Sequence, residues 1–213
     1  KTIKGKSNAY AYFYIFLWQI GIFFAIKPVL KKIKFDFIHH VTFASLRFPS
    51  FLSLYNIPFI YGPVAGGDTI PFRLRKKFSF LEKMREFIRD INNRYIKISP
   101  FINLTLSRSH KIYVTSEETK KLIPKKYYHK TYLKLAIGID GVKNLDEKYY
   151  KEDKSYTLCY VGNLLYLKGT SILISTFYEL TKKNKNIRLL IAGDGPEISN
   201  INKMIHKLNI SNF

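Results

Sequence analysis

Residues 160–180 read YVGNLLYLKGTSILISTFYEL, and residues 187–197 follow them as IRLLIAGDGPE. In both stretches an apolar run ends at a glycine, and a helical pattern of apolar residues begins after the turn. Apolar strands that alternate with helices are typical of a parallel sheet that helices cover on both faces. The two stretches therefore predict an α/β fold, in which ligands bind beyond the carboxyl ends of the strands.

The residues upstream continue the alternation of strands and helices. Residues 138–154 are rich in Gly, Asp, Lys and Glu, lack periodicity and are predicted to form an interdomain linker. We therefore predict two domains, residues 1–137 and residues 155–213. The elements expected in the first domain are strands at 35–41, 57–62, 111–116 and 131–137 and helices at 49–55, 78–98 and 117–123, the last opened by a capping box of Thr115 with Glu118.

The composition is strongly basic, with a formal net charge of +21 over 213 residues. Such a surface attracts anions, including nucleic acids, anionic lipids and phosphorylated small molecules, although a lysine-rich compositional background explains the charge equally well. The sequence contains no nucleic-acid recognition motif, so we expect no specific nucleic-acid partner. The single cysteine, Cys159, excludes an internal disulfide and a cysteine metal cluster within this chain, and a reducing cytoplasmic location is expected.

Two segments are candidates for contact with a membrane. Residues 9–26 are uncharged and barely long enough to span a bilayer, but Gln19 and Gly21 lie near the middle of the run. This segment is compatible with a spanning helix, a buried helix or a helix on the membrane surface. Residues 78–98 carry an apolar helical stripe beside arginines and lysines. We expect the stripe to pack on the domain, and docking on a membrane is the alternative.

The strongest candidate for ligand binding is the turn between Gly162 and Lys168. Gly162 ends an apolar strand, and Lys168 stands where the next helix begins. A glycine lets a phosphate approach the backbone, a helix N-terminus offers free N–H groups, and a lysine adds a full positive charge. Leu167 and Gly169 occupy the positions where a P-loop has a glycine and a hydroxyl residue, so the turn is not a P-loop. It is predicted to hold a diphosphate; the alternative is a plain strand-to-helix turn with a surface lysine.

Two weaker signals accompany this turn. Gly193 and Asp194 belong to a tight turn that is compatible with either a ligand contact or a purely structural role. His39 and His40 are neighbours on an expected strand, so their side chains point to opposite faces of the sheet. One of them could act as an acid or a base, or the ring nitrogens of both could form hydrogen bonds within the fold and have a structural role only. No spacing resembles a zinc site, so we expect no metal.

These residues resemble the retaining glycosyltransferases of the GT-B fold, in the large glycosyltransferase family four. The stretch YVGNLLYLKGTSILISTFYEL followed by IRLLIAGDGPE is similar to the family's signature in the order and spacing of its glycines and lysine. Upstream, FDFIHHVTFASLRFPSFL, IPFIYGPVAGG and VTSEETKKL are similar to the acceptor domain of bacterial members that build surface polysaccharides. The resemblance implies two Rossmann-like domains that face each other across a cleft, the second of them incomplete in this chain.

The resemblance also implies a division of roles between the domains. The donor, a nucleoside-diphosphate sugar, would contact Gly162, Asn163, Lys168, Gly169, Gly193 and Asp194, and Lys168 would neutralise the leaving diphosphate. The acceptor side would include His39, Gly66 and Gly67, with His40 as a second catalytic candidate. The family requires no metal or other cofactor, because a phosphate oxygen of the donor takes the acceptor's proton in the route usually proposed.

The chain departs from the family pattern at several positions. Asn163 stands where the family often has arginine, and Ile137 replaces the usual asparagine before Gly-Ile-Asp. The histidine common after the acceptor-domain strand is replaced near Gly66 and Gly67. The family's paired glutamates would lie beyond Phe213 and its first glycine-rich loop before Lys1, so we expect the chain to be truncated at both ends and inactive alone.

The function implied by the resemblance is transfer of a sugar, with retention, to a glycan or lipid-linked acceptor in surface polysaccharide synthesis. It would take place in the cytoplasm, at the inner face of the membrane. One alternative is a non-catalytic α/β module that binds a phosphorylated ligand, and another is a basic protein that binds an anionic membrane surface.

Overall fold

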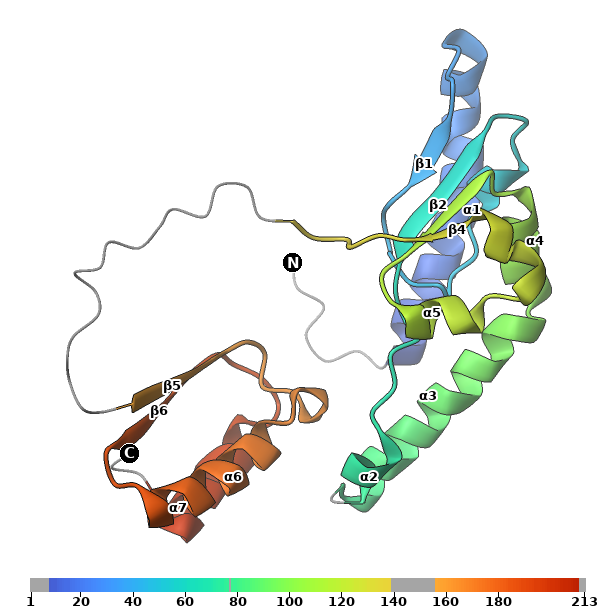
Figure 1. The fold of residues 1–213 in the computed structure, drawn as a ribbon. Helices are drawn as coiled ribbons and strands as arrows, with labels where there is room; N and C mark the ends of the chain where they lie inside the picture. The colour runs from blue at the N-terminus through green and yellow to red at the C-terminus, as the bar shows by residue number, and fades with distance from the viewer. Residues whose placement is uncertain (1–7, 77, 139–155, 211–213) are drawn as a thin grey trace. The chain divides into compact units, whose positions relative to one another are not determined.

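The computed structural model describes residues 8–76, 78–138 and 156–210. The chain forms two compact units, one within residues 1–140 and one within residues 141–213 (Figure 1). The predicted linker lies outside the described residues except for Gly138. The architecture is mixed α/β with parallel strands in both units, as predicted.

A four-stranded parallel sheet forms the centre of the first unit, in the order β1-β2-β3-β4. The sheet register pairs Ile38 with Phe59, Ile60 with Lys111, and Ile112 with Thr131. Because all strands are parallel, their carboxyl ends lie along one edge. The four predicted strands are all present, within a few residues of the expected bounds: β1 Ile38–His40, β2 Phe59–Val64, β3 Lys111–Val114 and β4 Thr131–Leu133.

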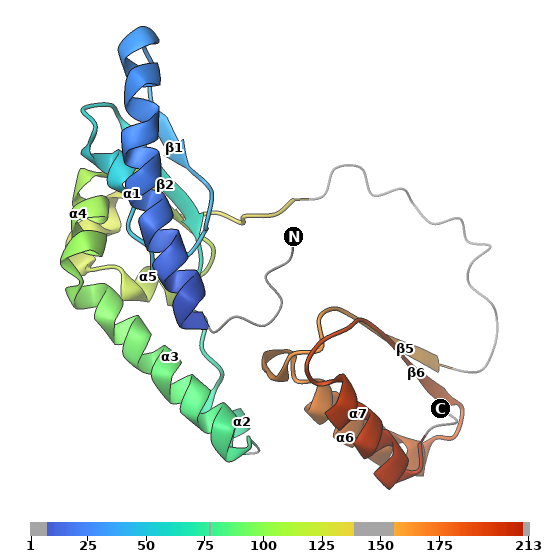
Figure 2. The same cartoon turned by 180° about the vertical axis from the view of Figure 1, so that it is seen from behind.

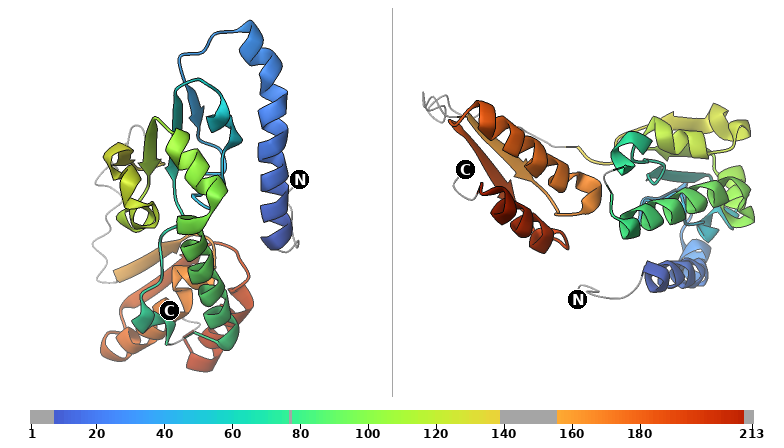
Figure 3. Two further views of the ribbon diagram at one scale, coloured as in Figure 1. Left: turned by 90° about the vertical axis from the view of Figure 1, so that its right-hand side faces the viewer. Right: turned by 90° about the horizontal axis from the view of Figure 1, so that it is seen from below.

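Helices lie on both sides of this sheet. The longest, α1, runs along one side, and α5 lies on the other (Figures 2 and 3). The buried core between sheet and helices includes Leu46, Phe59, Tyr61, Ile96, Ile102, Leu106, Ile112 and Val114. The helical elements are α1 Asn8–Lys32, η1 Phe51–Leu54, α2 Phe72–Arg75, α3 Phe80–Ile98, α4 Pro100–Arg108, α5 Glu117–Leu122 and η2 Lys125–Lys130, where η marks a 3-10 helix.

Two expectations for these helices were wrong, the helix at 49–55 and the cap of the helix at 117–123, and α4 was not predicted. Residues 49–55 form only the short η1. A separate helix, α4, follows α3 directly, because the side chain of Ser99 accepts a hydrogen bond from the backbone of Ile102 and begins a new helix. The cap of α5 is Ser116, whose Oγ accepts from the Thr119 backbone N–H at 3.2 Å. Thr115 cannot serve as this cap, since its own N–H continues the strand ladder to the Val64 carbonyl at 3.1 Å.

One side of α1 packs on the rest of the first unit, and the other side is exposed. Phe16 meets Phe51 with ring centroids 5.8 Å apart, Phe23 stacks on Tyr55 at 4.9 Å, and Gln19 is fully buried. The outer side carries exposed apolar residues such as Phe13, Leu17 and Phe24. Within α1, Phe13–Lys32 is long and apolar enough to cross a bilayer, judged by length and composition alone.

His40 is buried in the first unit beside the ring of Tyr61, with centroids 5.4 Å apart. Burial lowers the pKa of His40 from its ordinary 6.5 to about 4; a hydrogen bond at the Thr42 backbone opposes this shift, and the charge of His39 adds to it. The imidazole is therefore neutral at neutral pH. In the folded state His40 takes up its proton only at a much lower pH than in the unfolded chain.

The second unit consists of two parallel strands and two helices that share one core. Strands β5 (Tyr156–Val161) and β6 (Ile187–Ala192) pair along their full length, and α6 (Thr170–Lys183) and α7 (Ile198–Leu208) follow them. Both helices and the strands contribute to a core of Leu164, Ile174, Phe177, Ile187, Ile201 and Ile210. The expected helix cover on both faces was wrong for the described residues, because α6 and α7 pack on the same face (Figure 1) and leave Leu190 and Val161 exposed.

The turns that follow β5 and β6 are joined by their backbones. The Gly162 N–H donates to the Ala192 carbonyl at 3.0 Å, Leu164 N–H to the Asp194 carbonyl at 2.8 Å, and Glu197 N–H to the Leu164 carbonyl at 3.1 Å. This approach leaves no room for side chains, because a Cβ at Gly193 would lie 1.9 Å from the Gly162 carbonyl oxygen. Gly195 is equally restricted, since its Cβ would lie 2.4 Å from the Leu164 carbonyl oxygen. The two glycines of the second turn are therefore required by packing, before any ligand is considered.

We expect Gly193→Ala to lower the free energy of unfolding of the second unit by about 2–3 kcal/mol, because the added methyl group separates the two turns. The matched control is Gly169→Asn, since Gly169 has a φ of 70° but open space around it. Asparagine tolerates this left-handed conformation, so the control should lose less than about 1 kcal/mol. Urea unfolding monitored by circular dichroism measures both variants, and equal losses would contradict the packing argument.

A second prediction concerns acid stability. Because the folded-state pKa of His40 is depressed, the unfolded chain binds more protons between about pH 6.5 and about pH 4, and stability falls as the pH falls through this window. The contribution from His40 is about 3 kcal/mol at pH 4. Urea unfolding at about pH 7 and about pH 4.5 should show a smaller acid loss for His40→Gln than for wild type. Identical losses in the two proteins would refute the buried, neutral state.

Candidate functional site

Lys168 lies where β5 passes into α6. After β5, the chain forms the short 3-10 helix η4 (Tyr166–Lys168), and Gly169 then adopts the left-handed conformation with φ 70° and begins α6. The Lys168 backbone N–H is fixed by the Leu165 carbonyl at 2.9 Å, while its side chain is exposed. No acidic group among the described residues forms an ion pair with Lys168. Its ammonium group is thus available to an anion.

The N-terminus of α6 adds hydrogen-bond donors at the same place. The first turn of a helix has backbone N–H groups without intrahelical partners, and Gly169 provides no side-chain cap for them. The Thr170 hydroxyl is also fully buried and has no hydrogen-bond partner among the described residues. The helix dipole and Lys168 both favour negative charge here. This combination suits a phosphate or diphosphate.

The predicted donor-side residues all lie in the two joined turns and in the start of α6. Asn163 is exposed, and its backbone carbonyl accepts a hydrogen bond from the Tyr160 hydroxyl at 3.2 Å. The Asp194 carboxylate accepts from the Gly195 N–H at 2.7 Å, and its carbonyl accepts from Leu164. Gly193 and Asp194 therefore have structural contacts of their own. Their part in binding a donor, like that of Gly162 and Asn163, stays a prediction.

The residues predicted for the acceptor side lie near the carboxyl edge of the first sheet. His39 is exposed on β1, with its Nε2 2.7 Å from the Gly62 carbonyl, whereas His40 points into the core. The Gly67 N–H donates to the Thr119 hydroxyl at 3.1 Å, and a Cβ at Gly67 would lie 2.4 Å from the Thr119 Cα. This turn is thus pressed against the start of α5.

Sequence reasoning missed Arg47, which holds the same turn from the other side. One guanidinium nitrogen donates to the Gly66 carbonyl at 2.8 Å and to the Asn93 side chain, on α3, at 2.7 Å. Arg47 and Asn93 are 46 residues apart, and no local pattern marks either of them. Arg47 therefore couples the predicted acceptor turn to α3.

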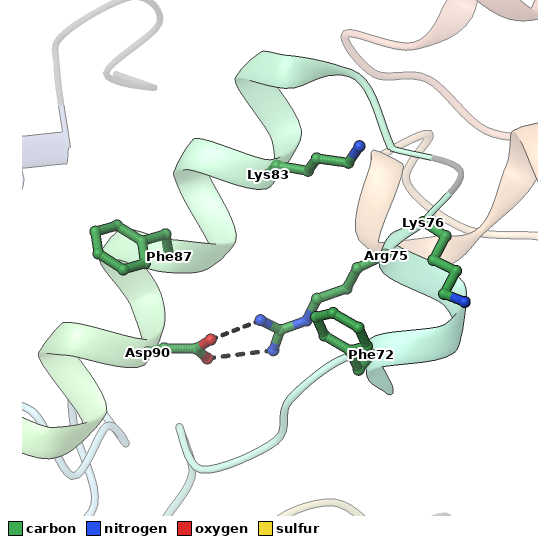
Figure 4. A pocket seen from close by; sticks show the side chains of 6 residues that line it. All are labelled: Phe72, Arg75, Lys76, Lys83, Phe87 and Asp90. Carbon is green, nitrogen blue, oxygen red and sulfur yellow. Dashed lines mark hydrogen bonds and ion pairs between the residues drawn. The ribbon is translucent and has the colours of Figure 1, made fainter.

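A pocket of about 510 Å³ lies between α2 and α3 and was also missed (Figure 4). Two hydrogen bonds of 2.6 and 3.2 Å join the Arg75 guanidinium to the Asp90 carboxylate across it. The hydrogen bond from Arg75 holds the pKa of Asp90 below its usual range, helped by the charges of nearby arginines. Aromatic and cationic side chains dominate the rest of the lining, which consists of Phe72, Lys76, Lys83 and Phe87.

Among the described residues no three His, Cys, Asp or Glu side chains gather as metal ligands would. The buried acidic group Glu86 is instead paired with Arg89 and lies 3.7 Å from Arg75. These contacts fix α2 on α3. The candidate site is therefore defined by cations, helix N–H groups and glycines.

Comparisons with known proteins relate the chain to glycosyltransferases. Residues 142–212, which include the whole described part of the second unit, match the family Glycosyl transferases group 1. A protein of Methanocaldococcus jannaschii named as an uncharacterized glycosyltransferase is 29% identical over 168 residues, which cover 70% of this chain. The match covers 41% of that relative, so the chain spans about two fifths of its length. The second unit is thus similar to a group 1 glycosyltransferase domain, and the similarity extends into the first unit.

Proposed function

We propose that this protein is a glycosyltransferase that moves a sugar from a nucleoside-diphosphate sugar to a glycan or a lipid-linked acceptor. The observation that carries the proposal is the exposed Lys168 beside the N-terminus of α6, which has no side-chain cap, at the carboxyl end of β5. Lys168 has no ion-pair partner in the part of the chain that the structure describes. The match of the second unit to Glycosyl transferases group 1 supports the same activity.

The proposed role of Lys168 follows from the charge that develops during transfer. As the bond between sugar and diphosphate breaks, negative charge grows on the leaving phosphate oxygens. A preorganised ammonium group and helix N–H donors stabilise that charge more in the transition state than in the ground state. Asn163 adds no charge, so Lys168 is the principal cation of this turn. Gly162, with no Cβ, lets the phosphates approach the backbone.

No protein base is needed in the retaining route, in which a phosphate oxygen of the donor accepts the proton of the acceptor. The burial of His40 favours a structural role for that residue, since its Nε2 is shielded and has no partner among the described residues. His39 is the exposed member of the pair and remains the better acceptor-side candidate. We place the reaction in the cytoplasm, with surface polysaccharide synthesis as its purpose and no metal or other cofactor.

Replacing Lys168 with alanine should weaken binding of the nucleoside-diphosphate sugar by about tenfold to a hundredfold, the range expected for losing a hydrogen bond to a charged group. The measurement is a thermal-shift screen of the full-length protein with UDP-, GDP- and ADP-sugars, followed by titration with the sugar that stabilises it. Lys183→Ala is the matched control, because it removes the same charge at the opposite end of α6.

Each part of the proposal can fail separately. A wild-type protein that responds to none of these sugars would contradict the glycosyltransferase assignment and favour a module for another phosphorylated ligand. An undiminished response in Lys168→Ala would remove Lys168 from the donor site but leave the activity in place. An equal loss in Lys183→Ala would show that only the overall charge of α6 matters.

A further inference from the structure

Helix α3 turns its apolar stripe away from the rest of the first unit. Its polar face, which includes Glu86 and Asn93, is buried against the rest of the first unit. The stripe predicted to pack on the domain is therefore outside, and that expectation was wrong. The exposed side chains range from 43% at Met84 to 76% at Phe80 and Ile98, and they are Phe80, Leu81, Met84, Phe87, Ile88, Ile91, Tyr95 and Ile98.

Polar contacts explain why α3 packs in this orientation. Glu86 pairs with Arg89, Asp90 with Arg75 of α2, and Asn93 accepts a hydrogen bond from Arg47. The contacts to Arg75 and Arg47, which lie outside α3, hold the polar face inward. The apolar stripe then has no cover among the described residues, although a helix in water normally buries such a stripe. A contiguous apolar face of this kind marks a binding surface.

The charges beside the stripe indicate what covers it. Every acidic side chain of α3 is engaged within the protein, since Glu82 belongs to the capping box with Ser79, and Glu86 and Asp90 pair with arginines. Exposed cations lie along the same helix: Lys83, Arg94 and Lys97. An anionic bilayer offers acyl chains to the stripe and phosphates to the cations at the same time.

The short helix α2 extends this surface. Phe72 is 77% exposed, and with Phe87 it lines the pocket between α2 and α3. Lys76 and Lys83 reach out from the two helices beside it (Figure 4). Aromatic rings beside lysines are the combination found at the level of lipid head groups.

We propose that the outward face of α2 and α3 docks in the interface of an anionic lipid bilayer, with α3 parallel to the membrane plane. The docked helix does not cross the bilayer, because its buried face is polar. The proposal does not depend on the nucleotide-sugar site, which lies in the other unit. Docking would bring the first unit to lipid-linked molecules.

The test is flotation of the whole protein with vesicles of phosphatidylcholine and with vesicles in which about a third of the lipid is phosphatidylglycerol. We expect wild type to bind the anionic vesicles. Ile88→Gln with Ile91→Gln should weaken partitioning at least about tenfold, because these side chains enter the acyl region. Arg94→Gln with Lys97→Gln should weaken it about fivefold per cation on anionic vesicles only.

Two matched variants control for other apolar surfaces. Leu135→Gln with Ile137→Gln removes two residues that are even more exposed but lie outside α3, and it should bind like wild type. Phe13→Gln with Phe24→Gln changes the outer side of α1. Circular dichroism establishes that each variant is folded, and titration with the nucleotide sugar reports separately on the donor site.

Several results would overturn the proposal. The first is a wild-type protein that floats with neither kind of vesicle. The second is an isoleucine variant of α3 that binds anionic vesicles as wild type does. The third is loss of binding in the α1 variant alone. The last result would assign attachment to α1. Sedimentation equilibrium adds a further one: self-association that is lost in the α3 variant, without vesicle binding, would make this face a protein interface.

Discussion

The close approach of two backbone turns at the ends of β5 and β6 determines where α6 begins and where the Lys168 backbone lies in the second unit. Leu164 bonds to the turn after β6 through both its N–H and its carbonyl, so the two turns cannot move independently. Gly193 permits this approach, and the left-handed Gly169 then directs the chain into α6. The position of Lys168 relative to the first turn of α6 is thus set by backbone contacts. The backbone that carries Lys168 therefore needs little rearrangement when a phosphate binds.

In the first unit a group of polar contacts has the corresponding role. Arg47 connects the predicted acceptor turn to Asn93 of α3, and Arg75 connects α2 to Asp90 of the same helix. Because both contacts lie on one side of α3, they determine which face of the helix looks outward. The exposed apolar stripe is a consequence of these contacts, since turning it inward would separate Asp90 and Glu86 from Arg75 and Asn93 from Arg47.

Sequence patterns predicted what depends on neighbouring residues and missed what depends on distant ones. The apolar runs and their terminal glycines identified β5, β6 and the turn with Lys168, because strand, turn and helix signals are local. The period of α3 was equally clear, but a period defines a stripe and not the direction in which it faces. That direction comes from Arg75 and Arg47, which lie 15 and 46 residues from their partners in sequence. The buried state of His40 likewise depends on Tyr61, a residue of the next strand.

The acidic groups and the exposed cations occupy different places in the structure, so the positive charge is not spread evenly as a compositional background would be. On α3 the acidic residues are used in a cap and in ion pairs, and in the second unit Asp194 holds its turn and Glu179 pairs with Lys182. The cations outnumber these partners, and exposed ones remain at the start of α6 and along the apolar stripe of α3. Diphosphates and lipid head groups present the same phosphate oxygens to such cations. The proposed donor site in one unit and the proposed membrane surface in the other would both use this surplus of positive charge, and each adds a second feature of its own. At α6 that feature is a row of free N–H groups, and at α3 it is an apolar face.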